Sequence, residues 1–301
     1  MNGTHLTGLE GTNPLGFFAA LGIQVASEGS SEELRLWWSD DVVPHAVVDE
    51  SISIEAIITQ AMTILPAWLR SPAITSGLKP TGDIKFNESD ITTYLHNARL
   101  AGPNAGLAAC LVAEGSLDNS SAAKPTDLYF TAGQQKFLKM VKDILEGVTA
   151  EDLKIGMTGP WSYQSKLSSL MWDISDDSNY ALLASNPAKE KKLTNPGAEA
   201  LAVLGISNYP AFGSTGRTLT QGASGGWKRG AFTWPIWTKP ASRRVVSSLL
   251  AHTTASEPGL NKRALWYPSW GISRIMQSAI RRSDQGGYGT FSPPKVVWSR
   301  E

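Results

Sequence analysis

The chain has 301 residues, and its 27 Lys and Arg side chains balance its 27 Asp and Glu side chains, so the formal net charge is zero. An apolar content of 42% is that of a globular protein and excludes a disordered chain. The lone Cys110 excludes an intrachain disulfide framework and a cysteine metal cluster, the four histidines lack metal-ligand spacing, and no apolar run could span a bilayer. We therefore expect a cytoplasmic protein that uses no metal, cofactor or membrane.

The first half of the chain is predicted to combine helices with short strands. Asn13 and Pro14 are a favourable helix start, and the apolar run 14–26 lacks the basic region of a signal peptide, so it is predicted as a helix of the folded protein. Further patterns indicate strands over 34–38 and 42–48, helices over 51–65, 90–98 and 104–113, a loop over 115–126, and a strand over 128–130 before a helix over 132–146. Thr149, with Asp152 three residues later, predicts another helix start.

The charge changes sign near residue 189. Residues 1–188 carry 11 basic and 22 acidic side chains, whereas residues 189–301 carry 16 basic and 5 acidic ones. Such asymmetry suggests an acidic part joined to a part that faces a polyanion. We predict an acidic α+β N-terminal part over 1–188 and a basic nucleic-acid-contacting part over 189–301, either as two domains or as one continuous domain.

The basic half opens with a motif that resembles the start of the chain. Asn195-Pro196 leads to Leu204-Gly205-Ile206 much as Asn13-Pro14 leads to Leu21-Gly22-Ile23, with one residue of slippage. Either the chain contains an internal echo, or two helices simply use the same start and stop residues, which is the plainer interpretation.

The remaining elements complete an α+β prediction. Residues 213–230 hold six glycines and three basic residues, which predicts a mobile basic loop or the turns of a hairpin. A strand over 231–237 follows, and then helices over 242–252 and 269–282. The expected fold class is α+β, a mixed sheet-and-helix body with a basic, Trp-rich C-terminal part.

One segment matches an enzyme motif. Gly222-Ala223-Ser224-Gly225-Gly226 satisfies the Gly-x-Ser-x-Gly pattern of a hydrolase nucleophile elbow, with Ser224 as the nucleophile. That motif needs a buried strand before it and a helix after it, but Thr218–Gln221 is short and polar and the residues after it do not resemble a helix start. A serine hydrolase is therefore an alternative, and a chance match in a glycine-rich loop is the simpler explanation.

The nucleic-acid interpretation has more support. From residue 217 to the end there are 13 basic and 3 acidic residues, and tryptophans are interleaved with them. Arginine and lysine neutralise phosphates, and aromatic rings stack on bases or wedge into a duplex. On the predicted helix over 269–282, Trp270, Arg274, Gln277 and Arg281 would form one stripe along a phosphate backbone. The candidate nucleic-acid-binding residues are Arg217, Gln221, Ser224, Trp227, Lys228, Arg229, Arg243, Arg244, Lys262, Arg263, Arg274, Arg281 and Arg282.

These candidates carry different expectations. Arg217, Lys228 and Arg229 are predicted to contact phosphate or a duplex, Gln221 or Ser224 to touch base edges, and Trp227 to stack or wedge. Trp234 and Trp237, in contrast, could simply pack in the core. The alternative for the whole basic half is a structural adaptor that docks on an acidic protein.

A series of short motifs adds a family resemblance. The motifs, in chain order, are Leu9–Gly22 (LEGTNPLGFFAALG), Leu128–Gln135 (LYFTAGQQ), Gly159-Pro160-Trp161, Trp172-Asp173, Glu199–Ala202 (EALA) and Phe232–Trp237 (FTWPIW). This ordered set spans most of the chain and resembles the Cascade large-subunit-like family of type I-U/I-G CRISPR systems.

The resemblance implies a non-enzymatic subunit of a crRNA-guided surveillance complex. Its partners would be the other CRISPR subunits with their crRNA, target double-stranded DNA and a helicase-nuclease. The subunit would inspect the PAM-side duplex, hold the opened strands and help recruit the nuclease, while guide pairing reads the sequence. The family provides no catalytic residue to transfer. The Gly/Pro-rich tail after Arg282 departs from large subunits that end in a helical bundle, so a separate small subunit would be needed.

Overall fold

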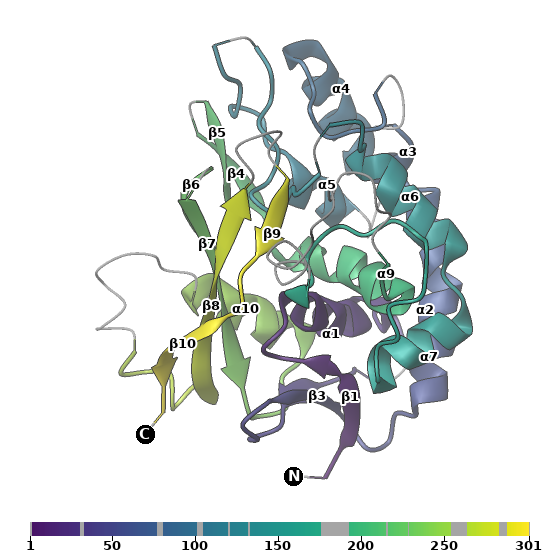
Figure 1. Ribbon diagram of the computed structural model, residues 1–301, viewed down its shortest axis with the longest axis vertical. Helices are drawn as coiled ribbons and strands as arrows, with labels where there is room; N and C mark the ends of the chain where they lie inside the picture. Colours follow the sequence, from purple (N-terminus) through teal and green to yellow (C-terminus); the bar gives the residue numbers. More distant parts are fainter. Residues whose placement is uncertain are drawn as a thin grey trace, which may run out of the picture.

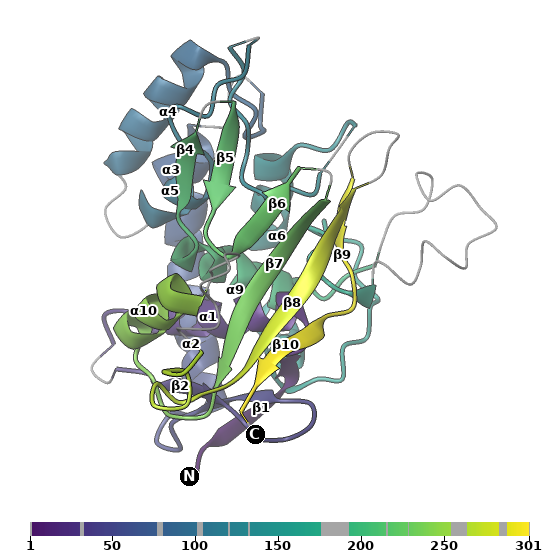
Figure 2. The ribbon, with the colours of Figure 1, turned by 90° about the vertical axis from the view of Figure 1, so that its left-hand side faces the viewer.

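The computed structural model describes residues 2–30, 33–76, 81–100, 105–119, 121–131, 133–175, 193–214, 216–227, 229–253, 264–282 and 288–300. The chain forms helices and antiparallel sheets, which confirms the α+β prediction. In Figure 1 the largest sheet lies to the left and most of the helices lie to the right, with the purple helix α1 and the green helix α9 at the centre. Figure 2 turns the left-hand side of Figure 1 toward the viewer and shows that sheet face on, with most of the helices behind it.

Nine helices and a short 3-10 turn are assigned in the described residues. The helices are α1 (Pro14–Ala26), α2 (Ile54–Leu69), α3 (Pro72–Thr75), α4 (Glu88–Arg99), α5 (Ala105–Leu111), α6 (Phe137–Gly147), α7 (Ala150–Thr158), α9 (Pro196–Gly205) and α10 (Arg243–Thr253), with the turn η3 (Ile206–Asn208). The predicted helix starts at Asn13, Thr149 and Asn195 are confirmed, because each side chain accepts a hydrogen bond from a backbone N–H of the first turn.

The strands assigned in the described residues form three antiparallel sheets. The strands are β1 (Thr4–Glu10), β2 (Leu36–Trp38), β3 (His45–Val48), β4 (Ala211–Ser214), β5 (Arg217–Thr220), β6 (Ala223–Gly226), β7 (Arg229–Trp237), β8 (Ile272–Arg282), β9 (Gly289–Phe291) and β10 (Lys295–Ser299). The largest sheet has the order β10-β8-β7-β6, with β9 also paired to β8, while β1-β3-β2 and β4-β5 form the smaller sheets. The glycine-rich stretch 213–230 is thus built into hairpins, the second of the two predicted possibilities.

The two helices that share the Asn-Pro start pack against each other. Gly22 of α1 lies so close to the Leu201 carbonyl that an added Cβ would collide with it, and Gly205 of α9 lies in the same way against the Phe18 carbonyl. Each glycine meets the residue that lies four positions before the other glycine, so the contact is reciprocal. The two helices run in the same direction, because Glu28 after α1 and Asn208 after α9 bind the same side chain, that of Arg243. The repeated Leu-Gly-Ile motif therefore marks a packing interface between the two halves of the chain.

Aromatic side chains fill the space between this helix pair and the large sheet. Phe17 stacks on Trp38 with ring centroids 5.5 Å apart, and Phe18 lies 5.2 Å from the Phe232 ring. Trp234 and Trp237 are fully buried, and their ring nitrogens donate to the carbonyls of Gly11 and Leu36. These two tryptophans pack in the core, and residues from both sides of residue 189 belong to one hydrophobic cluster.

The predicted helix over 269–282 is wrong, because this segment forms the central strand β8. Its apolar residues satisfy a helical pattern, but β8 pairs with β7 on one side and with β9 and β10 on the other. Arg274 and Gln277 then point to opposite faces of the sheet, so the proposed stripe with Trp270 and Arg281 does not exist.

Smaller differences concern the middle of the chain. Residues 128–130 form no strand, and α6 begins at Phe137, five residues later than predicted. Leu128, Tyr129 and Phe130 are nevertheless buried, since this segment packs against the end of the large sheet at β9. An apolar run that is buried without strand pairing cannot be distinguished from a strand by its pattern alone.

Candidate nucleic-acid interface

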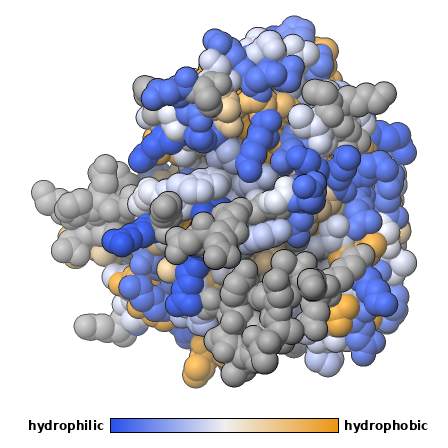
Figure 3. Space-filling model, turned by 45° about the horizontal axis from the view of Figure 1, so that its top comes forward, coloured by the Kyte–Doolittle hydropathy of each residue, from blue (hydrophilic) through white to orange (hydrophobic). Residues whose placement is uncertain are grey.

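Basic residues gather where the hairpins of the large sheet end. Arg229 starts β7, and Arg281 and Arg282 end β8. These ends lie side by side, because Gly230 of β7 is paired with Ile280 of β8. Arg217, at the start of β5, lies near the Asp127 carboxylate together with Arg282. We call Arg217, Trp227, Arg229, Arg281 and Arg282 the basic rim. Figure 3 brings the top of the molecule forward, and hydrophilic residues predominate among the residues that are coloured in this view.

Arg282 and Trp227 form the best-defined contact of the basic rim. The guanidinium carbon lies 3.6 Å from the centroid of the Trp227 ring, and its Nε donates to the Trp227 carbonyl over 3.0 Å. The other two nitrogens donate to the carbonyls of Tyr129 (2.6 Å) and Asp127 (2.8 Å). Trp227 is still 40% exposed, so Arg282 supports the ring while leaving part of it open to a stacking partner.

The charge on Arg282 survives its partial burial. Burial lowers the pKa of this guanidinium to about 10, and the neighbouring Asp127 and Tyr129 oppose the shift. Arg282 is therefore cationic at neutral pH. Its three hydrogen-bond acceptors are carbonyl oxygens, so these bonds hold the side chain in place without neutralising it.

The basic rim borders an open face of the large sheet. Along β7, Phe232, Trp234 and Ile236 point into the core, so Arg229, Ala231 and Thr233 belong to the opposite face. Ser224 is paired with Ala231, and Ala231 with Ala279, which places this row of small residues on that same face. Figure 2 shows the helices behind the sheet rather than over this part of it. A flat surface of small side chains next to arginines is accessible to an extended polyanion.

Arg229 is the most available cation of the basic rim. It is exposed and makes no ion pair or side-chain hydrogen bond with any residue that the structure describes. Lys228, Lys262 and Arg263, three other predicted contacts, lie outside the described residues.

Arg274 lies apart from the basic rim and has a structural role. It sits near the opposite end of β8, where its guanidinium donates to the carbonyls of Asp41 (2.7 Å) and Val42 (2.8 Å). This pair of bonds ties the turn between β2 and β3 to the large sheet. The structure thus does not group Arg274 with the other predicted contacts.

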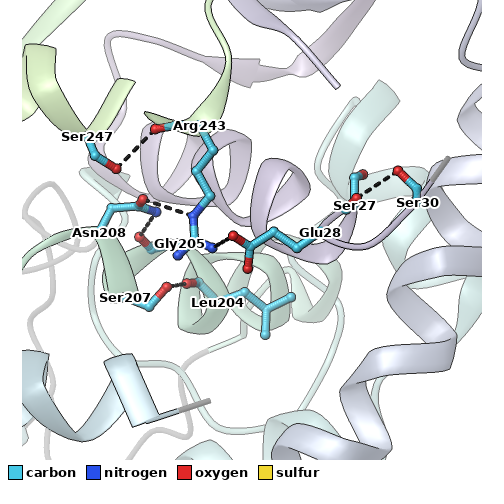
Figure 4. A network of polar contacts seen from close by, with 9 residues as sticks. All are labelled: Ser27, Glu28, Ser30, Leu204, Gly205, Ser207, Asn208, Arg243 and Ser247. Atoms are coloured by element: carbon cyan, nitrogen blue, oxygen red, sulfur yellow. Dashed lines mark hydrogen bonds and ion pairs between the residues drawn. The ribbon is translucent and has the colours of Figure 1, made fainter. Parts of the chain in front are cut away.

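Three further candidates meet at a separate pocket. Gln221, Arg243 and Arg244 line a cavity of about 680 Å³ beside the first turn of α10. Arg243 forms an ion pair with Glu28 and donates from its Nε to Asn208 Oδ1 over 3.4 Å (Figure 4). Arg244 is exposed at the same pocket.

The environment of Ser224 differs from a nucleophile elbow. Ser224 lies in the short strand β6, which turns back directly into β7, and a nucleophile elbow instead needs a helix after the serine. Gly222 and Gly225 have φ values of 83° and 81°, which suit the hairpin backbone. The glycines of the motif therefore serve the turns of a hairpin.

The sequence did not predict the residues whose backbone carbonyls bind Arg282 of the basic rim. Asp127 and Tyr129 lie more than 150 residues from Arg282 along the chain, and they bind it through carbonyls that any residue possesses. The wall of the pocket formed by Gln24, Ser27 and Glu28 was also missed. A polar Gln24 inside the otherwise apolar run 14–26 was the one available signal.

The described residues contain no group of three or more His, Cys, Asp or Glu side chains that could hold a metal ion. No helix among them is both long and apolar enough to cross a bilayer. No model of a known protein family matches the chain, and a search of curated proteins finds no similar sequence.

Proposed function

We propose that this protein is a non-enzymatic, nucleic-acid-binding subunit of a crRNA-guided surveillance complex, similar to a large subunit of type I-U/I-G CRISPR systems. The observation that carries the nucleic-acid part is the basic rim, in which Arg282 stacks on the half-exposed Trp227 ring while Arg229 and Arg281 lie at neighbouring strand ends beside an open sheet face. The CRISPR part depends on the resemblance of the ordered motifs.

The chemistry of the basic rim suits a phosphate backbone that carries accessible bases. Arginine binds phosphate with two parallel hydrogen bonds, and each neutralised phosphate releases counterions. Trp227, supported by Arg282, offers its ring to an unpaired base or to the end of a duplex. We infer that the basic rim holds the PAM-side duplex near the point where the strands open. Ser224, which lies on the open face, would contact the same strand.

The remainder of the proposal concerns the assembly. The partners are the other CRISPR subunits with their crRNA, the target DNA and a helicase-nuclease that the complex recruits in the cytoplasm. A separately encoded small subunit would complete the complex. The acidic residues of the first half keep the DNA on one side and leave the other surfaces for protein neighbours.

Charge reversal at the basic rim tests the nucleic-acid part. Arg229→Glu should weaken the binding of a short duplex by roughly tenfold or more and lower the slope of log affinity against log salt by about 1, because one phosphate contact is lost. Lys154→Glu is the control, since Lys154 is exposed on α7, on the helical side of the molecule, and changes the net charge equally. Fluorescence anisotropy between about 50 and 200 mM salt measures both quantities. Equal affinities and slopes in the two variants would refute the role of the basic rim.

Purification of the protein with its natural partners tests the CRISPR part. Co-purified guide RNA with a repeated backbone subunit is the expected result. An acidic protein partner without RNA would contradict the proposal and favour the adaptor. Labelling of Ser224 by a serine-reactive probe, lost in Ser224→Ala, would instead favour the hydrolase.

A further inference from the structure

A second polar site lies away from the basic rim. The cavity of about 680 Å³ is enclosed by the end of α1, the segment after it, α5, η3 and the first turn of α10. Its volume falls within the range of small-molecule sites and exceeds what a single inorganic ion needs. The cavity collects residues from both halves of the chain around one space.

One wall of the cavity is cationic. Arg243 and Arg244 occupy the first turn of α10, which contains no acidic residue. The helix dipole is positive at this end, so two arginines here add to its field and favour an anion. Glu28 and Asn208 hold the Arg243 side chain across the cavity, as Figure 4 shows, while Arg244 has no ion-pair partner in the described part of the chain.

Behind the facing wall lie two buried acceptors that lack donors among the described residues. The Gln24 side chain is only 3% exposed, and its Nε2 donates to the carbonyls of Ala241 (2.8 Å) and Leu34 (3.3 Å). These two bonds fix the orientation of the amide, and its Oε1 finds no partner among the described residues. The hydroxyl of Ser27, 6% exposed and also lining the cavity, is equally unpaired. Unpaired buried polar atoms are unusual and need an explanation.

The two walls select a ligand with an anion at one end and hydrogen-bond donors at the other. We propose that the cavity binds a nucleoside monophosphate, as a free nucleotide or as the terminal unit of a strand. Its phosphate lies at the first turn of α10 beside Arg244. Its base turns amino and ring N–H groups toward Ser27, Gln24 and Glu28. This site goes beyond the proposed function, because none of its residues belongs to the basic rim.

Titration calorimetry on the full chain tests the proposal, with AMP, GMP, CMP and UMP and with inorganic phosphate as the probe of the anion end alone. At least one nucleotide should bind, and more tightly than phosphate. Arg244→Ala should weaken both by roughly tenfold, since a charge-assisted contact is lost. Ser27→Ala should weaken only the nucleotide.

Ser27→Ala also separates binding from folding. The substitution removes an unpaired buried hydroxyl, so the unliganded variant should melt at the same temperature as the wild type or higher. Arg229→Ala, on the basic rim, is the control and should leave nucleotide binding unchanged. The absence of heat with all four nucleotides, or equal nucleotide affinity in Ser27→Ala and the wild type, would overturn the proposal.

Short single strands distinguish the two sources of the ligand. A strand with a terminal phosphate that competes with the bound nucleotide, and loses this ability in Ser27→Ala, identifies the terminal unit of a nucleic acid. Competition by mononucleotides alone identifies a free nucleotide. Loss of duplex binding in Arg229→Glu is measured separately. The proposal for the basic rim and the proposal for the cavity are therefore tested independently.

Discussion

Asp127 lies beneath the basic rim in a setting that disfavours its charge. Burial raises the pKa of its carboxyl above the usual range, and Thr220, Arg282 and Arg217 oppose this shift without cancelling it. The folded protein therefore binds this proton more tightly than the unfolded chain does. The stability that follows is present at acidic pH and is lost as the pH rises through the folded-state pKa.

An amide at position 127 should remove this dependence on pH. Asp127→Asn keeps the shape of the side chain without a titrating group, so its melting temperature relative to the wild type should rise between about pH 3 and pH 7, the range that covers an elevated carboxyl pKa. Calorimetric melting of both proteins across this range measures the difference. A difference that is constant or falls with pH would contradict the burial of the carboxylate.

The sequence predicted residue types better than residue environments. It predicted that Trp227 stacks or wedges and that Trp234 and Trp237 could pack in the core. The pairing of β6, β7 and β8 leaves the first ring 40% exposed and the other two buried. Similarly, the tally of arginines could not show that Arg274 binds a turn while Arg229 is exposed. Long-range contacts decide both cases, and composition does not contain them.

At the scale of elements, β8 shows why a periodic pattern can mislead. Ile275 and Met276 point to opposite faces of the sheet, yet both are buried, because Ile275 is paired with Trp298 of β10 and Met276 faces the core. A strand covered on both faces loses the alternation that would identify it. The helix starts at Asn13, Thr149 and Asn195 were predicted correctly, since a capping side chain and its N–H partner are close in sequence.

The helix pair α1 and α9 offers a test of close packing. Gly22→Ala should destabilise the protein by about 1–3 kcal/mol or more, because its Cβ would collide with the Leu201 carbonyl. Gly106→Ala in α5 is the control, since its Cβ meets only the Ser207 carbonyl at 3.9 Å, and it should stabilise by up to about 1 kcal/mol. Urea denaturation compares the two variants. Equal stability would show that the helices do not touch at Gly22.

At the scale of the whole molecule, the division of charge does not coincide with a division of the core. Residues of the acidic half and of the basic half share one hydrophobic cluster. The composition predicted where the charge changes sign but not that α1 and α9, from opposite halves, would lie together at the centre (Figure 1). A charge pattern describes the surface, whereas packing depends on the apolar side chains.

Joint packing predicts joint unfolding. The two halves should melt in a single transition in which calorimetric and van't Hoff enthalpies agree. Scanning calorimetry, with near-ultraviolet circular dichroism to follow the tryptophans, measures this. Two separate transitions, one of them free of tryptophan signal, would contradict a shared core.

The reciprocal glycine contact also has a mechanical consequence. Gly22 and Gly205 fix the relative position of the two helices, since each lies against a backbone carbonyl of the other helix. An axial slip of one helix would bring bulkier neighbours, such as Leu21 or Ile23, toward those carbonyls. The axial register between α1 and α9 is therefore fixed. The position of the hairpins that follow α9 is then fixed relative to the sheet β1-β3-β2. A force applied to these hairpins would be transmitted to the first half of the chain through the contact between α1 and α9.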